Sequence, residues 1–392
     1  MRRLSILGST GSIGEQTLEV CRRAPADFTA VALSCCSDTD TLYKQIKEFS
    51  PVAVAVCDEA KGRELGKRLK DEGIGTEVYV GADSNSVIAT ISECDTVVGA
   101  IVGFAGLKPV YEAIKAGKRI ALANKETLVA GGHFIMPLAK EKGVDILPVD
   151  SEHSAIWQCL RNGDENNLDR ILLTASGGPF RGKKREELDN VTLENALNHP
   201  TWKMGGKITI DSATMLNKGL EIIEAHHLFG VDVDKIDVVV HPQSVVHSMV
   251  RLKDGSVLGQ MGRPSMILPI LVALYYPERG PAVMRPFDPF EAGCNNLTFE
   301  KCDTDVFRLV SLAYETGRAG GILPAVMNAA NEIAVMSFLE GKTGFLDIER
   351  TVYEVCSYFA KQTGVKADID TVTQADMEAR NKAIEILRNN AK

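Results

Sequence analysis

The fold of the first half of the chain is decided by the stretch Leu4-Ser-Ile-Leu-Gly8-Ser-Thr-Gly11-Ser-Ile-Gly14. Leu4 to Leu7 read as a strand, and the glycine-rich turn leads into a helix with apolar positions at Ile13, Leu18 and Val20. Glycines allow a tight turn and the close approach of a diphosphate, which the helix N-terminus attracts. The spacing is G-x-x-G-x-x-G rather than G-x-G-x-x-G. Its position after a strand and before a helix predicts nucleotide binding, and the alternative is a turn that serves only packing.

Residues 1–150 alternate between short apolar runs and helical patterns, which is typical of a parallel sheet with crossover helices. Further strands are expected at Thr29–Leu33, Val52–Val56, Val97–Val102 and Arg119–Ala123. The last of these runs into Asn124-Lys125-Glu126, which places a cation and an acid at a carboxyl edge, where open α/β sheets bind ligands. The alternative is a Lys-Glu pair on the surface of a helix start.

A further apolar run, Val144–Val149, precedes Asp150-Ser151-Glu152-His153. In an extended chain, residues i and i+2 point the same way, so Asp150 and Glu152 would present two carboxylates side by side, with Ser151 on the other face. Two adjacent carboxylates repel each other, and a divalent cation with hard oxygen ligands would remove that conflict. The spacing alone leaves open an exposed loop pair.

The stretch 211–221 carries a second acid with several polar groups. Its hydroxyl, amide, ammonium and carboxylate could bind a phosphate and a metal, and they come from Ser212, Asn217, Lys218 and Glu221. Upstream, Ser176-Gly-Gly could offer a hydroxyl and free amides to a phosphate. Many such turns, however, only reverse the direction of the chain and bind no ligand. The segment around His199 and Trp202 fits either a movable lid or an exposed loop with one anchoring indole.

Residues 236–262 predict an antiparallel unit with strands Ile236–Val240, Val245–Leu252 and Val257–Met261 and a turn at Asp254-Gly255. Such a sheet could pack on the first domain or on a second subunit. His241 and His247 within it favour structural roles. The proline-rich segment from Pro277 to Pro289 indicates a linker, and the patterning beyond residue 304 is helical, notably over 325–339 and 374–388.

Composition narrows the function classes. The formal charge is 44 minus 52, or −8, which argues against a nucleic-acid partner. No apolar run approaches about 18 residues, so no membrane span is expected. The N-terminus lacks the pattern of a signal peptide. Nine cysteines without C-x-x-C spacing indicate reduced thiols and a cytoplasmic location.

Seven motifs occur in an order that resembles the 1-deoxy-D-xylulose 5-phosphate reductoisomerase family, and the resemblance runs through essentially the whole chain. They are Gly8-Ser-Thr-Gly-Ser-Ile-Gly14, Ala123-Asn-Lys-Glu126, Pro148-Val-Asp-Ser-Glu-His153, Ser176-Gly-Gly-Pro-Phe180, His199-Pro-x-Trp-x-Met-Gly205, Asp211-Ser-Ala-Thr-Met215 with Asn217-Lys-Gly-Leu-Glu221, and Asn328-Ala-Ala-Asn-Glu332. The resemblance implies an α/β protein. Its parts would be a Rossmann-like dinucleotide-binding domain (1–150), a central α+β catalytic and dimerisation domain (151–285) with a mobile lid near 176–206, a linker (286–303) and a small helical C-terminal domain (304–392).

The resemblance also implies an activity. Such enzymes rearrange 1-deoxy-D-xylulose 5-phosphate and reduce the resulting aldehyde to give 2-C-methyl-D-erythritol 4-phosphate in the non-mevalonate isoprenoid route, as homodimers that use NADPH and Mg²⁺, Mn²⁺ or Co²⁺. The implied metal ligands are Asp150, Glu152 and Glu221. The implied substrate ligands are Lys125, Ser151, Ser176, His199, Trp202, Ser212, Asn217, Lys218 and Glu221, of which Ser176, Ser212, Asn217 and Lys218 hold the phosphate. The implied cofactor contacts are Thr10, Gly11, Ser12, Ile13, Ser37, Asn124, Glu126 and Gly205. Catalytic roles fall to Lys125, Glu152 and His199.

One position departs from the family pattern. Members often place a basic residue or Asn at the ribose end of the second strand, where this chain has Cys36-Ser37-Asp38. A carboxylate beside a 2′-phosphate is repulsive unless it points away, so NADPH is expected and NADH stays open. The competing functions are a simple dehydrogenase, which would need a nucleophilic cysteine such as Cys159, and a nucleotide sensor, which would lack a full ligand set.

Overall fold

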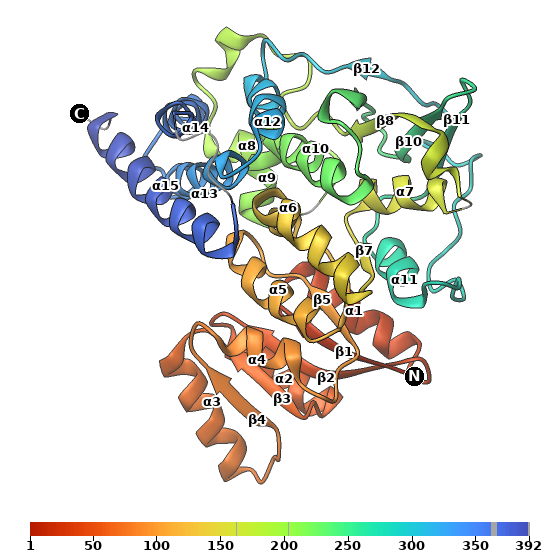
Figure 1. Cartoon of the computed structure of the whole chain (residues 1–392), viewed down its shortest axis with the longest axis vertical. Coiled ribbons are helices and arrows are strands. Elements are labelled where there is room, and N and C mark those ends of the chain that lie inside the picture. Colours follow the sequence, from red (N-terminus) through yellow and green to blue (C-terminus); the bar gives the residue numbers. More distant parts are fainter. Residues whose placement is uncertain (162, 203, 362–366, 391–392) are drawn as a thin grey trace. The chain divides into compact units, whose positions relative to one another are not determined.

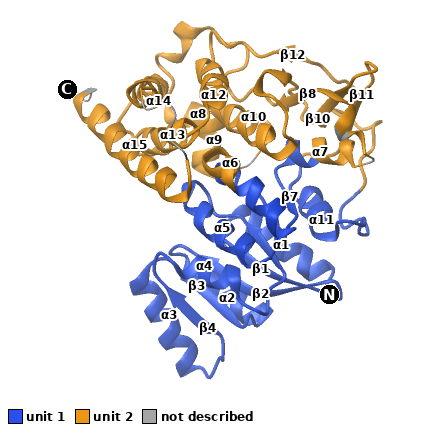
Figure 2. Cartoon of the chain, in the orientation of Figure 1, with its two compact units in different colours: residues 1–127, 135–154, 265–285 blue, residues 128–134, 155–264, 286–392 orange. Residues whose placement is uncertain are grey.

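The computed structural model describes residues 1–161, 163–202, 204–361 and 367–390 (Figure 1). The chain forms two compact units (Figure 2). Unit 1 consists of residues 1–127, 135–154 and 265–285, and unit 2 of residues 128–134, 155–264 and 286–392. The three-domain division expected from the sequence stays a prediction, and it differs from these units in its boundaries.

Unit 1 contains a seven-stranded parallel sheet in the order β4-β3-β2-β1-β5-β6-β7. The strands are β1 (Arg2–Leu7), β2 (Phe28–Cys35), β3 (Ala53–Val56), β4 (Glu77–Val80), β5 (Thr96–Gly99), β6 (Arg119–Leu122) and β7 (Ile146–Pro148). The order reverses between β1 and β5, and ligands bind at such a switch point beyond the carboxyl ends of the strands. The α/β class expected for this half is confirmed, whereas β4 was missed because Glu77-Val-Tyr-Val80 is a short, partly exposed edge strand.

Helices connect these strands and bury them. They are α1 (Ser12–Arg23), α2 (Thr39–Phe49), α3 (Glu59–Asp71), α4 (Ser84–Thr90), the 3₁₀ turn η1 (Phe104–Gly106), α5 (Leu107–Lys115) and α6 (Lys125–Lys142, whose residues 128–134 lie in unit 2). Strands β3 and β5 are buried along their whole length, as expected for parallel strands covered on both faces. Helix α11 (Ile267–Tyr275) also belongs to unit 1, where Tyr275 packs edge-on against Phe28 and donates a hydrogen bond to Asp27 at 2.6 Å.

Unit 2 is built on a five-stranded sheet in the order β11-β10-β8-β9-β12. Its strands are β8 (Leu168–Ala175), β9 (Ile236–Val240), β10 (Val246–Leu252), β11 (Val257–Met261) and β12 (Glu300–Lys301). The predicted hairpin of β10 and β11 is confirmed. The prediction that Ile236–Val240 belongs to an antiparallel unit with it is wrong, because β9 runs parallel to β8, and β8 separates β9 from β10.

The other elements of unit 2 are mostly helical. They are α7 (Ser151–Leu160, whose first four residues lie in unit 1), η2 (Asp164–Asn167), η3 (Arg185–Leu188), α8 (Leu193–Leu197), α9 (Gly206–Ala213), α10 (Leu216–Phe229), η4 (Val233–Lys235), α12 (Arg308–Ala319), α13 (Leu323–Leu339), α14 (Phe345–Phe359) and α15 (Ile369–Asn390). The predicted C-terminal helices are confirmed. Helix α13 forms their core, since most of its residues are buried and it packs against α14 and α15.

Two further expectations concern the cysteines and membrane-spanning helices. All nine cysteines are free thiols. Among the described residues, no helix combines the length and the apolar character that crossing a membrane requires.

Three histidines line a cavity of about 430 Å³ in unit 2. The ring of His227 lies 4.7 Å from that of His226 and 6.4 Å from that of His133, between ring centroids. A side chain at Gly132 would come within 2.2 Å of the His227 ring, so only glycine admits the ring there. Burial, reinforced by the other two histidines, lowers the pKa of His227 to about 3.

We therefore predict that acid destabilises unit 2 partly through His227. In the unfolded chain this histidine takes up a proton below pH ~6.5, whereas the folded protein resists protonation down to pH about 3. The unfolding free energy should fall with decreasing pH in this window, by up to ~1.4 kcal/mol per pH unit from this group. Urea unfolding between neutral and acid pH should show a shallower dependence in His227→Gln, and an unchanged dependence would contradict the assignment.

Candidate functional site

The glycine turn after β1 leaves a helix N-terminus open to a ligand. Gly8 has φ +82°, and a Cβ there would lie 2.8 Å from the carbonyl oxygen of Ala100. A Cβ on Gly14 would lie 2.4 Å from the carbonyl oxygen of Gly8, so the turn and the helix touch backbone to backbone. No side chain caps α1 at its N-cap Gly11. The amides following Gly11 are therefore available to an anionic group, as expected for a dinucleotide diphosphate.

At the end of β2, the Asp38 carboxylate caps a helix. The Asp38 side chain is the N-cap of α2 and accepts a hydrogen bond from the Thr41 amide at 3.1 Å. Its negative charge is thus directed at a helix N-terminus, where it is stabilised. Ser37, the predicted cofactor contact, is exposed beside it.

At the end of β6, the expected cofactor contacts Asn124 and Glu126 are buried and held in place. Asn124 caps α6 by accepting from the Thr127 amide at 3.0 Å, while its Nδ2 donates to the Gly103 carbonyl and to the Glu126 carboxylate, each at 2.9 Å. A Cβ at Gly106 would come within 2.6 Å of the Asn124 side chain. The alternative of a surface Lys-Glu pair is wrong, because Lys125 and Glu126 are both only 6% exposed.

Lys125 forms an ion pair with the first of the predicted metal ligands. Its Nζ lies 2.6 Å from Asp150 Oδ2, and the two side chains are 8% and 10% exposed. Burial opposes ionisation of Asp150, but the Lys125 ammonium and the neighbouring His153 hold the pKa of the carboxyl well below its usual range. Asp150 therefore stays ionised at neutral pH.

The local conformation of this acidic motif differs from the expectation. Strand β7 ends at Pro148, and α7 begins at Ser151, so Asp150 and Glu152 do not lie on one face of an extended strand. The Asp150 carbonyl accepts the Ser154 amide at 2.8 Å, and the Ser151 hydroxyl donates to Glu152 at 2.6 Å. Glu152 lies in the first turn of α7, where a negative charge is favoured, and this helix start replaces extension of the strand.

In unit 2, α10 carries the other expected polar ligands. Both oxygens of the Glu221 carboxylate are engaged, one by Asn217 Nδ2 at 2.5 Å and the other by Lys218 Nζ. Glu221 is 1% and Lys218 3% exposed. Each unit thus contains a buried carboxylate from the expected metal set, neutralised by a lysine ammonium. Hard oxygen donors that already need a positive charge beside them fit a divalent cation such as Mg²⁺.

The two serines expected at the phosphate belong to neighbouring backbone segments. Gly178, two residues after Ser176, has φ +65°, and a Cβ there would lie 2.5 Å from the Ser212 carbonyl oxygen. The Ser176-Gly-Gly turn therefore packs against the end of α9 at Ser212. Composition alone could not predict this close approach, because it joins two backbone segments that are distant in the sequence.

His199 and Trp202, the expected lid residues, are linked to Ser176. The Nδ1 of His199 accepts hydrogen bonds from the amides of Trp202 and Thr201 at 2.9 and 3.2 Å. The proton of the neutral ring is therefore on Nε2, which donates to the Ser176 hydroxyl at 3.0 Å. Burial lowers the pKa of His199, which favours this neutral form at pH 7.

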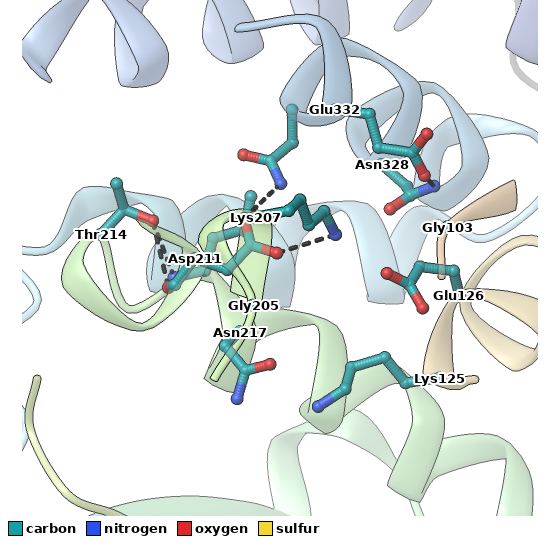
Figure 3. A network of polar contacts seen from close by, with 12 residues as sticks. Gly103, Lys125, Glu126, Gly205, Lys207, Asp211, Thr214, Asn217, Asn328 and Glu332 are labelled. Atoms are coloured by element: carbon teal, nitrogen blue, oxygen red, sulfur yellow. Dashed lines mark hydrogen bonds and ion pairs between the residues drawn. The ribbon is translucent and has the colours of Figure 1, made fainter. Parts of the chain in front are cut away.

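Sequence reasoning missed a buried polar network beneath Ser212. Asp211 is 1% exposed, and its carboxylate forms an ion pair with Lys207 Nζ at 2.8 Å (Figure 3). The other carboxylate oxygen accepts a hydrogen bond from Asn331 Nδ2 at 2.7 Å. Lys207 follows the predicted cofactor contact Gly205, which is the uncapped N-cap of α9, while Asn331 comes from α13. The network thus ties the helix that presents Ser212 to the C-terminal helices. The motif Asn328-Ala-Ala-Asn-Glu332 was a possible signal for it.

We predict that Asn331→Leu destabilises the protein, because it leaves one oxygen of a buried carboxylate without its donor. The expected loss is about 1–3 kcal/mol of unfolding free energy, measured by urea unfolding. The exchange D211N/N331D reverses the direction of the hydrogen bond and should recover part of the loss. Asn389→Leu on the exposed surface of α15 is the control and should have little effect. Equal effects of the two leucine variants would contradict the role of the network.

Comparisons with known proteins agree with the motif pattern. A family model for 1-deoxy-D-xylulose 5-phosphate reductoisomerase matches residues 4–132, and models of C-terminal domains of the same enzyme match residues 146–229 and 261–382. Relatives named 1-deoxy-D-xylulose 5-phosphate reductoisomerase include one from Clostridium botulinum strain Loch Maree, 50% identical over 97% of this chain and 98% of its own. Another, from Desulfitobacterium hafniense strain DCB-2, is 51% identical over 99% of this chain and 100% of its own.

Solved structures give the same answer. A reductoisomerase in complex with NADPH, fosmidomycin and magnesium is 39% identical, with a TM-score of 0.94 and coverage of 99% of this chain and 98% of its own. The Zymomonas mobilis enzyme in complex with NADPH is 40% identical, with a TM-score of 0.90 and coverage of 98% and 99%. The chain belongs to the 1-deoxy-D-xylulose 5-phosphate reductoisomerase family.

Proposed function

We propose that this protein converts 1-deoxy-D-xylulose 5-phosphate to 2-C-methyl-D-erythritol 4-phosphate, using NADPH and a divalent metal, in the non-mevalonate isoprenoid route. The observation that carries the proposal is the pair of buried lysine–carboxylate contacts, Lys125 with Asp150 and Lys218 with Glu221, at the motif positions of the family. Solved members of that family contain NADPH and magnesium.

Asp150, Glu152 and Glu221 are the proposed metal ligands, and Mg²⁺, Mn²⁺ and Co²⁺ all suit their oxygen atoms. A bound divalent cation would supply a Lewis acid that polarises the substrate carbonyl. Asp150 contributes an ionised carboxylate because Lys125 and His153 keep its pKa low. Lys125 and Glu152 are then the proposed groups for moving protons at the substrate oxygens, with Ser151 beside them to bind the substrate.

The phosphate of the substrate is assigned to groups of unit 2. These are the hydroxyls of Ser176 and Ser212, the amide of Asn217 and the ammonium of Lys218. Their placement rests on the close approach of Gly178 to Ser212 and on the start of α10 at Leu216. The neutral His199 orients the Ser176 hydroxyl, and with Trp202 it would cover the substrate and exclude water.

The nicotinamide cofactor is assigned to unit 1 and to Gly205. The backbone from Thr10 to Ile13 would hold the diphosphate at the α1 N-terminus, with Ser37 at the adenosine ribose. Asn124 and Glu126 would position the nicotinamide, which supplies the hydride. NADPH is favoured over NADH because Asp38 caps α2 instead of serving as the ribose acceptor.

The competing functions have less support. A dehydrogenase that acts through Cys159 would need an activated thiolate, but burial raises the pKa of this thiol. A nucleotide sensor would have no use for two buried lysine–carboxylate pairs. The charge of −8 still argues against a nucleic-acid partner.

We also propose a cytoplasmic homodimer. The nine free thiols suit a reducing compartment, and the exposed strand β11 at one edge of the unit 2 sheet offers a surface for a second copy. Size-exclusion chromatography with light scattering should give twice the 42.5 kDa chain mass, and a monomer at working concentration would refute the dimer.

The first test of function follows NADPH oxidation with 1-deoxy-D-xylulose 5-phosphate, with Mg²⁺ or Mn²⁺ added back after chelation. The absorbance of NADPH should fall only when both substrate and metal are present. Glu221→Gln should lower the metal-dependent rate about 100-fold or more while NADPH binding survives. The exposed Glu340→Gln is the control. Unchanged turnover of the Glu221 variant would remove this residue from the metal site.

A further inference from the structure

The strands β2 and β3 are each followed by an acid, Asp38 and Asp58, whose carboxylate caps the N-terminus of the next helix. Asp38 Oδ1 accepts the Thr41 amide at the start of α2. Asp58 Oδ1 accepts the amides of Ala60 and Lys61 at 3.0 and 3.1 Å, at the start of α3. Neither carboxylate therefore resembles the ribose-binding acid of NAD-dependent enzymes, which keeps its oxygens for the two ribose hydroxyls.

The backbone holds the start of α3 beside the end of β2. The parallel pairing of β2 with β3 continues past both strands, since the amide of Cys57 donates to the Cys35 carbonyl at 3.2 Å and that of Asp58 to the Cys36 carbonyl at 2.9 Å. Three residues later the chain reaches Lys61 in the first turn of α3. Its position relative to β2 is thus set by a sheet register rather than by a free loop.

Lys61 carries a positive charge that no described carboxylate neutralises. Its Nζ lies 2.9 Å from the Ser37 carbonyl oxygen, and this backbone acceptor is its partner. The two arginines of the same helix, in contrast, are paired with carboxylates, because Arg63 contacts Glu59 at 3.0 Å and Arg68 contacts Glu72 at 3.3 Å. The ammonium of Lys61 is exposed and keeps two donor positions for another ligand.

We propose that Lys61 and Ser37 recognise the 2′-phosphate of NADPH, so that Lys61 is the residue that determines the preference for NADPH over NADH. The inference rests on the proposed function only in its use of a nicotinamide cofactor. In a sheet of this topology the adenosine ribose lies at the end of the second strand, which is where Ser37 and Lys61 meet. The Ser37 hydroxyl and the Lys61 ammonium supply a donor and a positive charge to a dianionic phosphate.

This assignment also explains how the chain could bind a 2′-phosphate although no basic residue directly follows β2. The sequence there is Cys36-Ser37-Asp38, which contains an acid and no cation. The cation comes instead from the next βα connection, 24 residues after Ser37. Helix capping by Asp38 and Asp58 directs the two nearby carboxylates at backbone amides, which limits their repulsion of the phosphate.

The test compares cofactor binding by Lys61→Gln with that of the wild-type protein. Isothermal titration calorimetry with NADP⁺, NAD⁺ and adenosine 2′-monophosphate measures recognition of the phosphate without turnover. We expect Lys61→Gln to weaken binding of NADP⁺ and of adenosine 2′-monophosphate about tenfold and to leave NAD⁺ unchanged. The difference should shrink at high salt, because an exposed charge is screened.

Two further variants separate charge from structure. Lys61→Arg keeps the charge and should retain the preference for NADP⁺. Lys70→Gln removes an exposed lysine near the other end of α3 and should change neither affinity. Equal weakening of NADP⁺ and NAD⁺ by Lys61→Gln, or no effect on either, would overturn the assignment. A wild-type protein that binds NADP⁺ but does not turn over 1-deoxy-D-xylulose 5-phosphate would refute the proposed function and leave this inference standing.

Discussion

Burial of ionised carboxylates next to lysine ammonium groups is the constraint on which the site depends. A carboxylate removed from water is strongly destabilised unless a positive charge and hydrogen bonds compensate it. Unit 1 meets this requirement for Asp150 through Lys125, and unit 2 meets it for Glu221 through Lys218 and Asn217. Such pairs contribute little net stability compared with apolar packing, so their retention at buried positions points to function.

The second constraint is the close approach of backbone segments, which only glycine permits. Gly8 lets the turn after β1 approach the Ala100 carbonyl, Gly14 brings α1 against that turn, and Gly178 brings the Ser176 turn onto the Ser212 carbonyl. A Cβ at any of these three positions would overlap backbone atoms, which cannot rotate away as a side chain can. Both proposed anion sites are therefore shaped by the main chain, and the side chains add charge and hydroxyl groups to them.

Much of the fold was readable from local pattern. Apart from β4, the parallel strands of unit 1 are short apolar runs, and the C-terminal helices have clear helical periodicity, so both were predicted within a few residues. The failures have specific causes. Pairing of β9 with β8 joins segments about 65 residues apart, which no local signal reports. The extended reading of Asp150 and Glu152 failed because helix initiation at Ser151 competes with strand continuation.

The sequence by itself determined which chemical groups are available and in which order. The motif residues Lys125, Asp150, Ser176 and Glu221 stand in the pattern of one enzyme family, and the glycine turn predicted a nucleotide. Only the tertiary structure decided what each group is free to do. It assigned Asp38 to capping α2, buried Asp211 beneath Ser212, and placed Lys61 beside Ser37. The physical reason is that pairing of charges depends on distances between residues remote in sequence, and these distances exist only after the sheets and helices have packed.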